Sequence, residues 1–122
     1  MKITINGKEQ ELNFGFGFIH EANTVWNTQR EGIEINLGVI YTTTALEMGD
    51  IERLAEIVYF ATSDNDNRVG KKDVMNYIQS LSLKELEDLF KGVKKGVDES
   101  VPVKFAMKKL NEMAKTSQKR AK

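Results

Sequence analysis

The residues best suited to chemistry in this sequence are an acidic loop, one histidine and two closely spaced glycines. The loop at 64–70 reads Asp-Asn-Asp-Asn-Arg-Val-Gly, and alternating oxygen donors followed by glycine are what a calcium loop requires. With Asp64 as the first position, however, Val69 occupies the sharp-turn position that needs glycine, and Met75 stands where a bidentate glutamate belongs. Because Asn and Asp side chains also hydrogen-bond nearby backbone groups, the sequence predicts a polar turn here rather than a calcium site.

The histidine and the glycine pair lack the partners that would make them reactive sites. His20 has no second histidine and no cysteine to share a metal with, so the usual nitrogen and sulfur ligands of zinc cannot be assembled. The pattern Gly15-Phe16-Gly17 lacks the third glycine and the acidic residue of a dinucleotide fingerprint. We therefore expect no catalytic residue, no metal and no cofactor, and a small helical binding module rather than an enzyme.

These glycines lie in an aromatic strand-to-helix junction. Residues 12–27 contain three of the six phenylalanines and the only tryptophan and histidine. We expect the aromatic side chains to pack an N-terminal hairpin onto helices, with the glycines as bend or close-approach positions. The predicted structural junction comprises Phe14, Gly15, Phe16, Gly17, Phe18 and Trp26.

The N-terminal half predicts a hairpin and three helices. Asn6-Gly7 separates two short runs at 2–5 and 8–14, and Asn-Gly is the strongest short hairpin signal. Helical spacing from Phe18 predicts a first helix that ends near Gln29. Residues 33–37 alternate like a strand, and a helix ending at Met48-Gly49 should follow. Asp50 then suits the N-cap of a helix at 51–61, whose apolar residues on almost every side predict a central position.

The C-terminal half predicts three further helices. After a polar loop at 63–70, one helix carries Val74, Tyr77, Ile78 and Leu81, and the Ser82 and Glu85 spacing of a capping box opens the next. Gly96 and the segment Asp98-Glu99-Ser100 should interrupt that helix, and Pro102 fits only the first turn of a last one. The predicted fold is mainly α (α+β), an N-terminal β-hairpin (1–14) followed by a bundle of about five to six helices. A single domain at 1–115 should precede a basic, disordered tail at 116–122.

Charge is unevenly divided along the chain. Residues 103–122 carry seven basic side chains against Glu112 alone, whereas residues 1–102 carry 11 basic and 17 acidic side chains. A basic segment of this kind can be a solvated helix face, a docking arm for an acidic protein surface or a nucleic-acid site. Because no aromatic residue follows Phe105, the pattern favours a solvated face over nucleic acid.

Two methionines of the last helix leave its role open. Thioether side chains most often fill cores, but they also suit surfaces that accept varied apolar helices. If the last helix forms such a surface, its partner-binding residues would be Phe105, Met107, Leu110, Met113, Lys108 and Lys109.

Three segments together resemble a known family. MKITINGK at 1–8, ELNFGFGFI at 11–19 and MGDIERL at 48–54, with Asn23 and Trp26, are similar to tail assembly chaperones of long-tailed (siphovirus-type) phages or prophages of Gram-positive bacteria, most strongly over residues 1–62. The resemblance implies a non-enzymatic protein that binds the tape measure protein and helps recruit tail tube subunits during tail morphogenesis. It also implies action in the bacterial host cytoplasm and absence from the mature virion.

Two further expectations accompany the resemblance. An apolar groove for a helical client would be shielded by self-association, so we expect concentration-dependent homo-oligomers. The sequence has no long apolar run, so no membrane contact is expected. The alternative function is a small nucleic-acid-binding accessory protein that uses the basic C-terminal tail.

Overall fold

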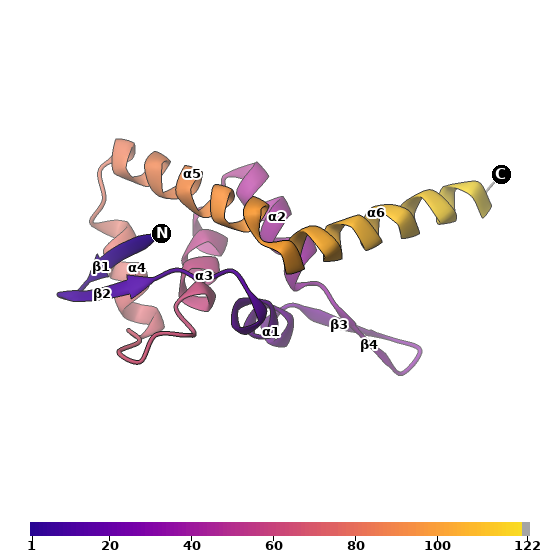
Figure 1. Cartoon of the computed structure of the whole chain (residues 1–122), viewed down its shortest axis with the longest axis horizontal. Coiled ribbons are helices and arrows are strands. Elements are labelled where there is room, and N and C mark those ends of the chain that lie inside the picture. Colours follow the sequence, from indigo (N-terminus) through magenta and orange to yellow (C-terminus); the bar gives the residue numbers. More distant parts are fainter. Residues whose placement is uncertain (121–122) are drawn as a thin grey trace.

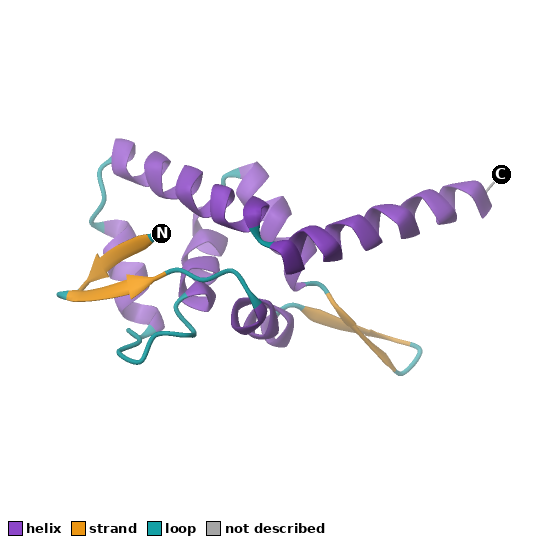
Figure 2. Cartoon of the chain, viewed as in Figure 1, coloured by secondary structure: helices purple, strands orange, loops and turns teal. Residues whose placement is uncertain are grey.

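The computed structural model describes residues 1–120 of the chain, with side chains to Thr116. A body of packed helices carries two extensions at one end, a β-hairpin and the C-terminal half of the last helix (Figure 1). The mainly α class with an N-terminal hairpin is confirmed, and Figure 2 shows how little of the chain is strand. The elements are β1 (Lys2–Ile5), β2 (Lys8–Glu11), α1 (Phe16–Val25), β3 (Asn27–Arg30), β4 (Ile33–Asn36), α2 (Gly38–Met48), α3 (Ile51–Ala61), α4 (Lys71–Gln79), α5 (Leu83–Glu99) and α6 (Val101–Arg120).

The N-terminal hairpin forms as predicted. β1 and β2 pair antiparallel with Ile5 opposite Lys8, and both turn residues have positive φ, 52° at Asn6 and 72° at Gly7. The buried face of the hairpin includes the Gln10 side chain, whose amide nitrogen donates to the Asn67 carbonyl oxygen at 3.1 Å. The hairpin is thus fastened to the loop between α3 and α4.

That loop is a polar turn, as the sequence predicts. The Asn65 side chain accepts from the Glu11 backbone N–H at 2.9 Å and donates to the Glu11 carbonyl at 2.8 Å. Arg68 donates to Glu21 at 2.6 Å and its guanidinium lies 3.9 Å from the centre of the Tyr59 ring. The side chains of Asn65 and Arg68 therefore tie the loop to β2 and α1.

The predicted first helix is too long, because a second hairpin, β3 with β4, begins where its last residues were expected. We expected that helix to reach about Gln29, but α1 ends at Val25 and Trp26 is extended, with φ −109° and ψ 92°. The Asn27 amide caps the end of α1 through the carbonyls of Asn23 and Thr24, both at 3.0 Å. Glu31 and Gly32, with φ values of 55° and 78°, make the turn. The alternation predicted at 33–37 is confirmed as β4.

The turn between α2 and α3 is formed by Gly49 and Asp50, as the sequence predicts. Gly49 is left-handed, with φ 69°, and the Asp50 carboxylate accepts from the Arg53 backbone N–H at 3.1 Å. α3 is the central helix, as predicted. Its buried residues are Leu54, Ala55, Ile57, Val58, Phe60 and Ala61.

The aromatic junction packs against α3 and α5. The ring centres of Phe14 and Phe18 lie 5.2 Å apart, and Trp26 lies edge-on to Phe60, also at 5.2 Å. Gly17 is a close-approach position, because a Cβ there would lie 2.6 Å from the Ser63 hydroxyl oxygen. Phe16 does not share the packing role, since its side chain is 81% exposed.

Helix α5 passes through Gly96 and ends within the predicted interruption, at Glu99. Ser82 and Glu85 form the expected capping box, with the Glu85 N–H donating to the Ser82 hydroxyl at 3.2 Å and the Ser82 N–H donating to the Glu85 carboxylate at 3.0 Å. Gly96 does not break the helix. A Cβ at Gly96 would lie 2.5 Å from the Phe14 ring, so glycine gives that ring its space, and the break falls at Ser100.

The last helix, α6, begins where Ser100 caps it. The Ser100 hydroxyl donates to the Phe14 carbonyl at 2.7 Å and accepts from the Val103 N–H at 3.4 Å. Pro102 lies in the first turn, as predicted. The helical backbone continues through residues 116–120, where the sequence predicts a disordered tail, and the last two residues of that tail lie outside the described residues. None of the helices in the described part of the chain has the length and hydropathy of a membrane span.

Candidate protein-interaction surface

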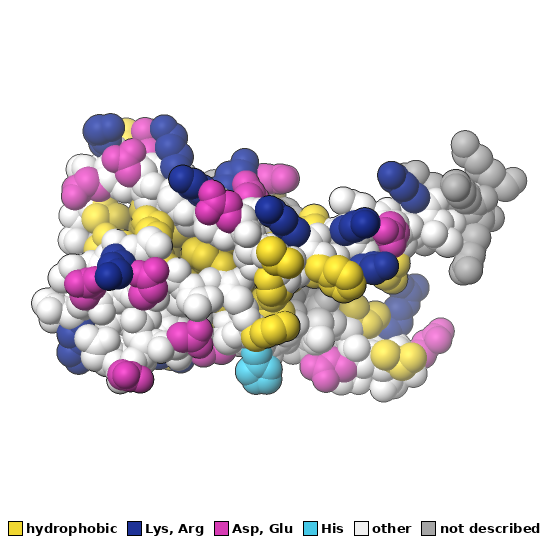
Figure 3. Space-filling view, viewed as in Figure 1, with side chains coloured by type: hydrophobic (Ala, Val, Ile, Leu, Met, Phe, Trp, Pro, Cys, Tyr) yellow, Lys and Arg dark blue, Asp and Glu magenta, His cyan; other side chains and the backbone are white. Residues whose placement is uncertain are grey.

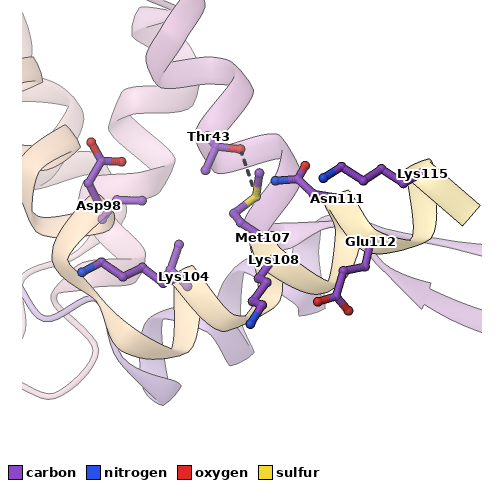
Figure 4. A pocket seen from close by; sticks show the side chains of 10 residues that line it. Thr43, Asp98, Lys104, Met107, Lys108, Asn111, Glu112 and Lys115 are labelled. Carbon is purple, nitrogen blue, oxygen red and sulfur yellow. Dashed lines mark hydrogen bonds between the residues drawn. The ribbon is translucent and has the colours of Figure 1, made fainter.

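Only the first half of the apolar face of α6 is covered by the body. Val103 is buried, and Ala106 and Met107 are half-buried against the core. Met107 reaches α2, where the Thr43 hydroxyl lies 3.8 Å from its sulfur (Figure 4). These contacts hold the N-terminal part of α6 against α2 and α5.

The apolar face of α6 continues beyond the part that packs against α2 and α5. Leu110 is half-buried, Met113 is 66% exposed and Ala114 is exposed. Helical spacing places these three residues in line with Ala106 and Met107, and Figure 1 shows α6 leaving the body over this stretch. We name residues 108–116 the distal segment of α6. Among the described residues, its apolar strip is half-covered at Leu110 and uncovered at Met113 and Ala114.

A groove runs beside this strip between α6, α2 and α5. Its volume is about 500 Å³, and polar side chains dominate its α6 wall (Figure 4). A smaller cavity of about 170 Å³ shares Thr43, Val97, Asp98 and Met107 with it. The groove is lined by Thr43, Val97, Asp98, Val103, Lys104, Met107, Lys108, Asn111, Glu112 and Lys115.

Lysines flank the apolar strip of α6 on both sides. Lys108 and Lys115 belong to the groove wall, whereas Lys109 lies on the other flank, 3.4 Å from Glu112 and 5.5 Å from the centre of the Phe105 ring. These charges are exposed, so their pairing adds little stability. Their effect is to surround an apolar strip with positive potential.

The structure separates the six partner-binding residues expected from sequence. Met107 and Lys108 line the groove, and Leu110 and Met113 form the uncovered strip. Phe105, 62% exposed, and Lys109 lie on the outer side of α6. The helix presents two adjacent surfaces rather than one groove.

Sequence reasoning missed a further apolar patch at the start of α6. Phe16 is 81% exposed and Val101 is 72% exposed, and the hydrogen bond between Ser100 and Phe14 brings their segments together. Figure 3 shows hydrophobic side chains gathered where α5 meets α6. The pattern of Phe14, Phe16 and Phe18 gave no signal that the middle ring faces solvent, because all three are equally apolar.

The groove and the strip of α6 offer surface for contact with another molecule. Within residues 1–120, no three His, Asp or Glu side chains gather as metal ligands. The groove combines apolar side chains, two valines and a methionine, with lysines, two carboxylates, an asparagine and a threonine, a mixture that suits recognition of another polypeptide.

Comparison with known proteins agrees with this picture. A family profile described as phage tail assembly chaperone protein, TAC, matches residues 2–112. The match extends well past residues 1–62, where the sequence resemblance is strongest, and ends at Glu112, before Met113 and Ala114 of the strip. No match was found among curated proteins or among solved structures. The chain belongs to the family of phage tail assembly chaperone proteins.

Proposed function

We propose that this chaperone binds the tape measure protein through the distal segment of α6 and helps recruit tail tube subunits during tail morphogenesis. The observation that carries the proposal is the apolar strip of Leu110, Met113 and Ala114, which continues a packed helix face into solvent. An apolar face on a rigid helix is what a helical client requires. The proposed activity is binding, without catalysis or cofactor.

The chemistry of the strip fits a long, amphipathic helical client. Met113 can adapt its shape to different apolar residues, since thioether side chains are flexible. Lys108, Lys109 and Lys115 flank the strip and favour a client helix with acidic borders. A repeated client pattern of this kind would allow several chaperones to bind along one tape measure protein.

The proposal extends to the setting of this function. We place the protein in the cytoplasm of a bacterial host, most simply a Gram-positive host of a long-tailed phage or prophage. It acts before the tail is complete and is absent from the mature virion.

The proposal is tested by co-expression with a helical segment of the tape measure protein from the same phage genome. Met113→Asp should abolish co-purification of the segment, because a charge on the strip opposes burial. Met75→Asp is the matched control, since Met75 is also exposed, at 44%, but lies on α4. Retained binding by Met113→Asp, or equal loss in both variants, would overturn the proposal.

The alternative, nucleic-acid binding by the basic end of α6, makes a different prediction. Phosphate contacts would give DNA binding that weakens steeply with salt and disappears when residues 115–122 are removed. Tape measure binding should persist in that truncation, weakened only by the loss of Lys115, because the apolar strip ends at Ala114. Salt-sensitive DNA retardation without client binding would favour the alternative.

A further inference from the structure

A second uncovered apolar surface lies at the turn between α2 and α3. Met48 is 77% exposed, Ile51 is 47% exposed and Tyr41 is 39% exposed. Tyr41 and Met48 border a depression of about 200 Å³. We name this surface the α2–α3 shoulder; its depression is lined by Tyr41, Thr44, Ala45, Met48, Asp50 and Arg53.

The shoulder is held in shape by the body beneath it. The Arg53 guanidinium lies 5.2 Å from the centre of the Trp26 ring and 5.5 Å from that of Tyr41. Asp50 caps α3, and Gly49 fixes the turn. A surface formed in advance binds without a large ordering cost, yet Met48 itself adds little to the fold because most of it is in solvent.

The charges around the shoulder are opposite to those around the strip of α6. Residues 47–56 contain four acidic side chains, at 47, 50, 52 and 56, and one basic side chain, Arg53. Glu47 and Glu52 are both exposed. In α6, residues 104–115 contain four lysines against Glu112 alone. Asp50 and Arg53 line the depression itself, and Glu47 also lines the small cavity beside Met107. The net acidic charge of residues 47–56 is complementary to an apolar strip between lysines.

We propose that the α2–α3 shoulder binds the distal segment of α6 from a second copy of this chain. Met113 of the second copy lies over Met48 and Ile51, and its flanking lysines face Glu47 and Glu52. Figure 1 shows the turn between α2 and α3 away from the C-terminal end of α6. The distal segment of α6 therefore cannot reach the α2–α3 shoulder of its own chain. The contact joins two different surfaces, and such contacts build rings or chains of copies.

One consequence rests on the proposed function. If the tape measure protein binds the same strip, a client and a second copy compete for α6. Self-association then keeps the strip covered until the client arrives, and client binding separates the copies.

The test is the mass of the protein by analytical ultracentrifugation over a wide concentration range. Wild type should form concentration-dependent oligomers, and Met48→Asp should remain monomeric across the range. Met75→Asp is the matched control and should associate like the wild type. Thermal unfolding by circular dichroism checks that each variant is folded. A wild type that is monomeric at every concentration, or a Met48→Asp variant that associates normally, would overturn the proposal.

Charge reversal tests the orientation of the contact. Lys108→Glu with Lys109→Glu, and separately Glu47→Lys with Glu52→Lys, should each abolish self-association, because like charges then face each other. Mixing the two variants should restore it, because every contact in an alternating assembly again joins opposite charges. Failure of the mixture to associate would contradict the assigned surfaces.

The same variants separate this proposal from the proposed function. Met48→Asp removes the shoulder but leaves α6 intact, so it should bind the tape measure segment as a monomer. If Met48→Asp is monomeric and does not bind the segment, self-association stands and the client site is misplaced. If it binds the segment but remains oligomeric, the client site stands and the shoulder is not the self-association surface.

Discussion

At the residue scale, Gly96 shows how the lack of a side chain at one position makes room for the aromatic junction. A helix interior disfavours glycine by about 1 kcal/mol relative to alanine, yet here the missing Cβ leaves space for the Phe14 ring. The Phe14 carbonyl in turn accepts from Ser100, where α6 begins. The direction in which α6 leaves the body is therefore set partly by Gly96.

We predict that Gly96→Ala destabilises the protein although alanine is the better helix former. A Cβ would lie 2.5 Å from the Phe14 ring, which is buried and cannot move freely. Such overpacking costs about 1–3 kcal/mol, more than the helix gains. Gly92→Ala is the control, because its Cβ would meet only the flexible end of Met1, at 2.7 Å. Thermal unfolding should show a lower midpoint for Gly96→Ala and an equal or higher one for Gly92→Ala; the reverse order would contradict the packing argument.

A second residue-scale prediction concerns pH. Hydrogen bonds from the Ser82 backbone N–H, and with its side chain, hold the pKa of Glu85 below its ordinary value of 4.5. A lowered folded-state pKa means that Glu85 stabilises the fold above its unfolded-state pKa. That stability is lost as the pH falls through the folded-state pKa.

Glu85→Gln removes the ionisation and keeps a side chain that can still cap α5. The difference in unfolding free energy between wild type and Glu85→Gln should therefore shrink as the solution is acidified from neutral pH. Denaturant unfolding of both proteins at a series of pH values measures it. Two parallel stability curves would show that the capping carboxylate has no lowered pKa.

At the element scale, the two extensions differ in how the chain supports them. α6 is anchored through Val103 and Met107, whereas every residue of β3 and β4 is exposed. A lone two-stranded hairpin is only marginally stable in water. Its persistence depends on the turn residues Glu31 and Gly32 and on the anchored ends at Trp26 and Leu37, whose backbone groups bond at 2.9 Å.

Changes at this turn should alter the hairpin without altering the core. Gly32 has φ 78°, and a Cβ added there would have no neighbour within 4 Å, so Gly32→Ala acts through backbone strain alone. Hydrogen exchange at the amides of 27–36 should become faster in Gly32→Ala. It should become slower in Glu31→Asn, because asparagine tolerates the left-handed conformation better than glutamate. Equal exchange in both variants would show that the turn does not control the hairpin.

The same elements show what sequence can and cannot predict. Asn6-Gly7, Gly49, Asp50 and the Ser82 capping box act through their immediate neighbours, so their roles were predictable from local chemistry. The Glu31-Gly32 turn carries a weaker signal, because glutamate is not a usual turn residue and the helical spacing before it has no clear stop. Gly96 looked like a helix stop because its ring partner, Phe14, is distant in sequence.

At the scale of the whole molecule, exposure decides which apolar residues serve function, and exposure depends on the arrangement of all the helices. The apolar spacing of Ala106, Met107, Leu110 and Met113 was predictable, but the position at which α2 and α5 cease to cover α6 was not. The sequence did predict the opposite charges of the body and the last helix. The structure adds that these charges border two separate apolar surfaces, the distal segment of α6 and the α2–α3 shoulder.

The uncovered strip of α6 is the client surface in the function proposed for this chaperone. Hydrogen–deuterium exchange of the wild-type chain, with and without a helical tape measure segment, tests that assignment most directly. Client binding should slow exchange across residues 108–116 more than anywhere else in the chain. Protection of another surface, with exchange in residues 108–116 unchanged, would contradict the assignment.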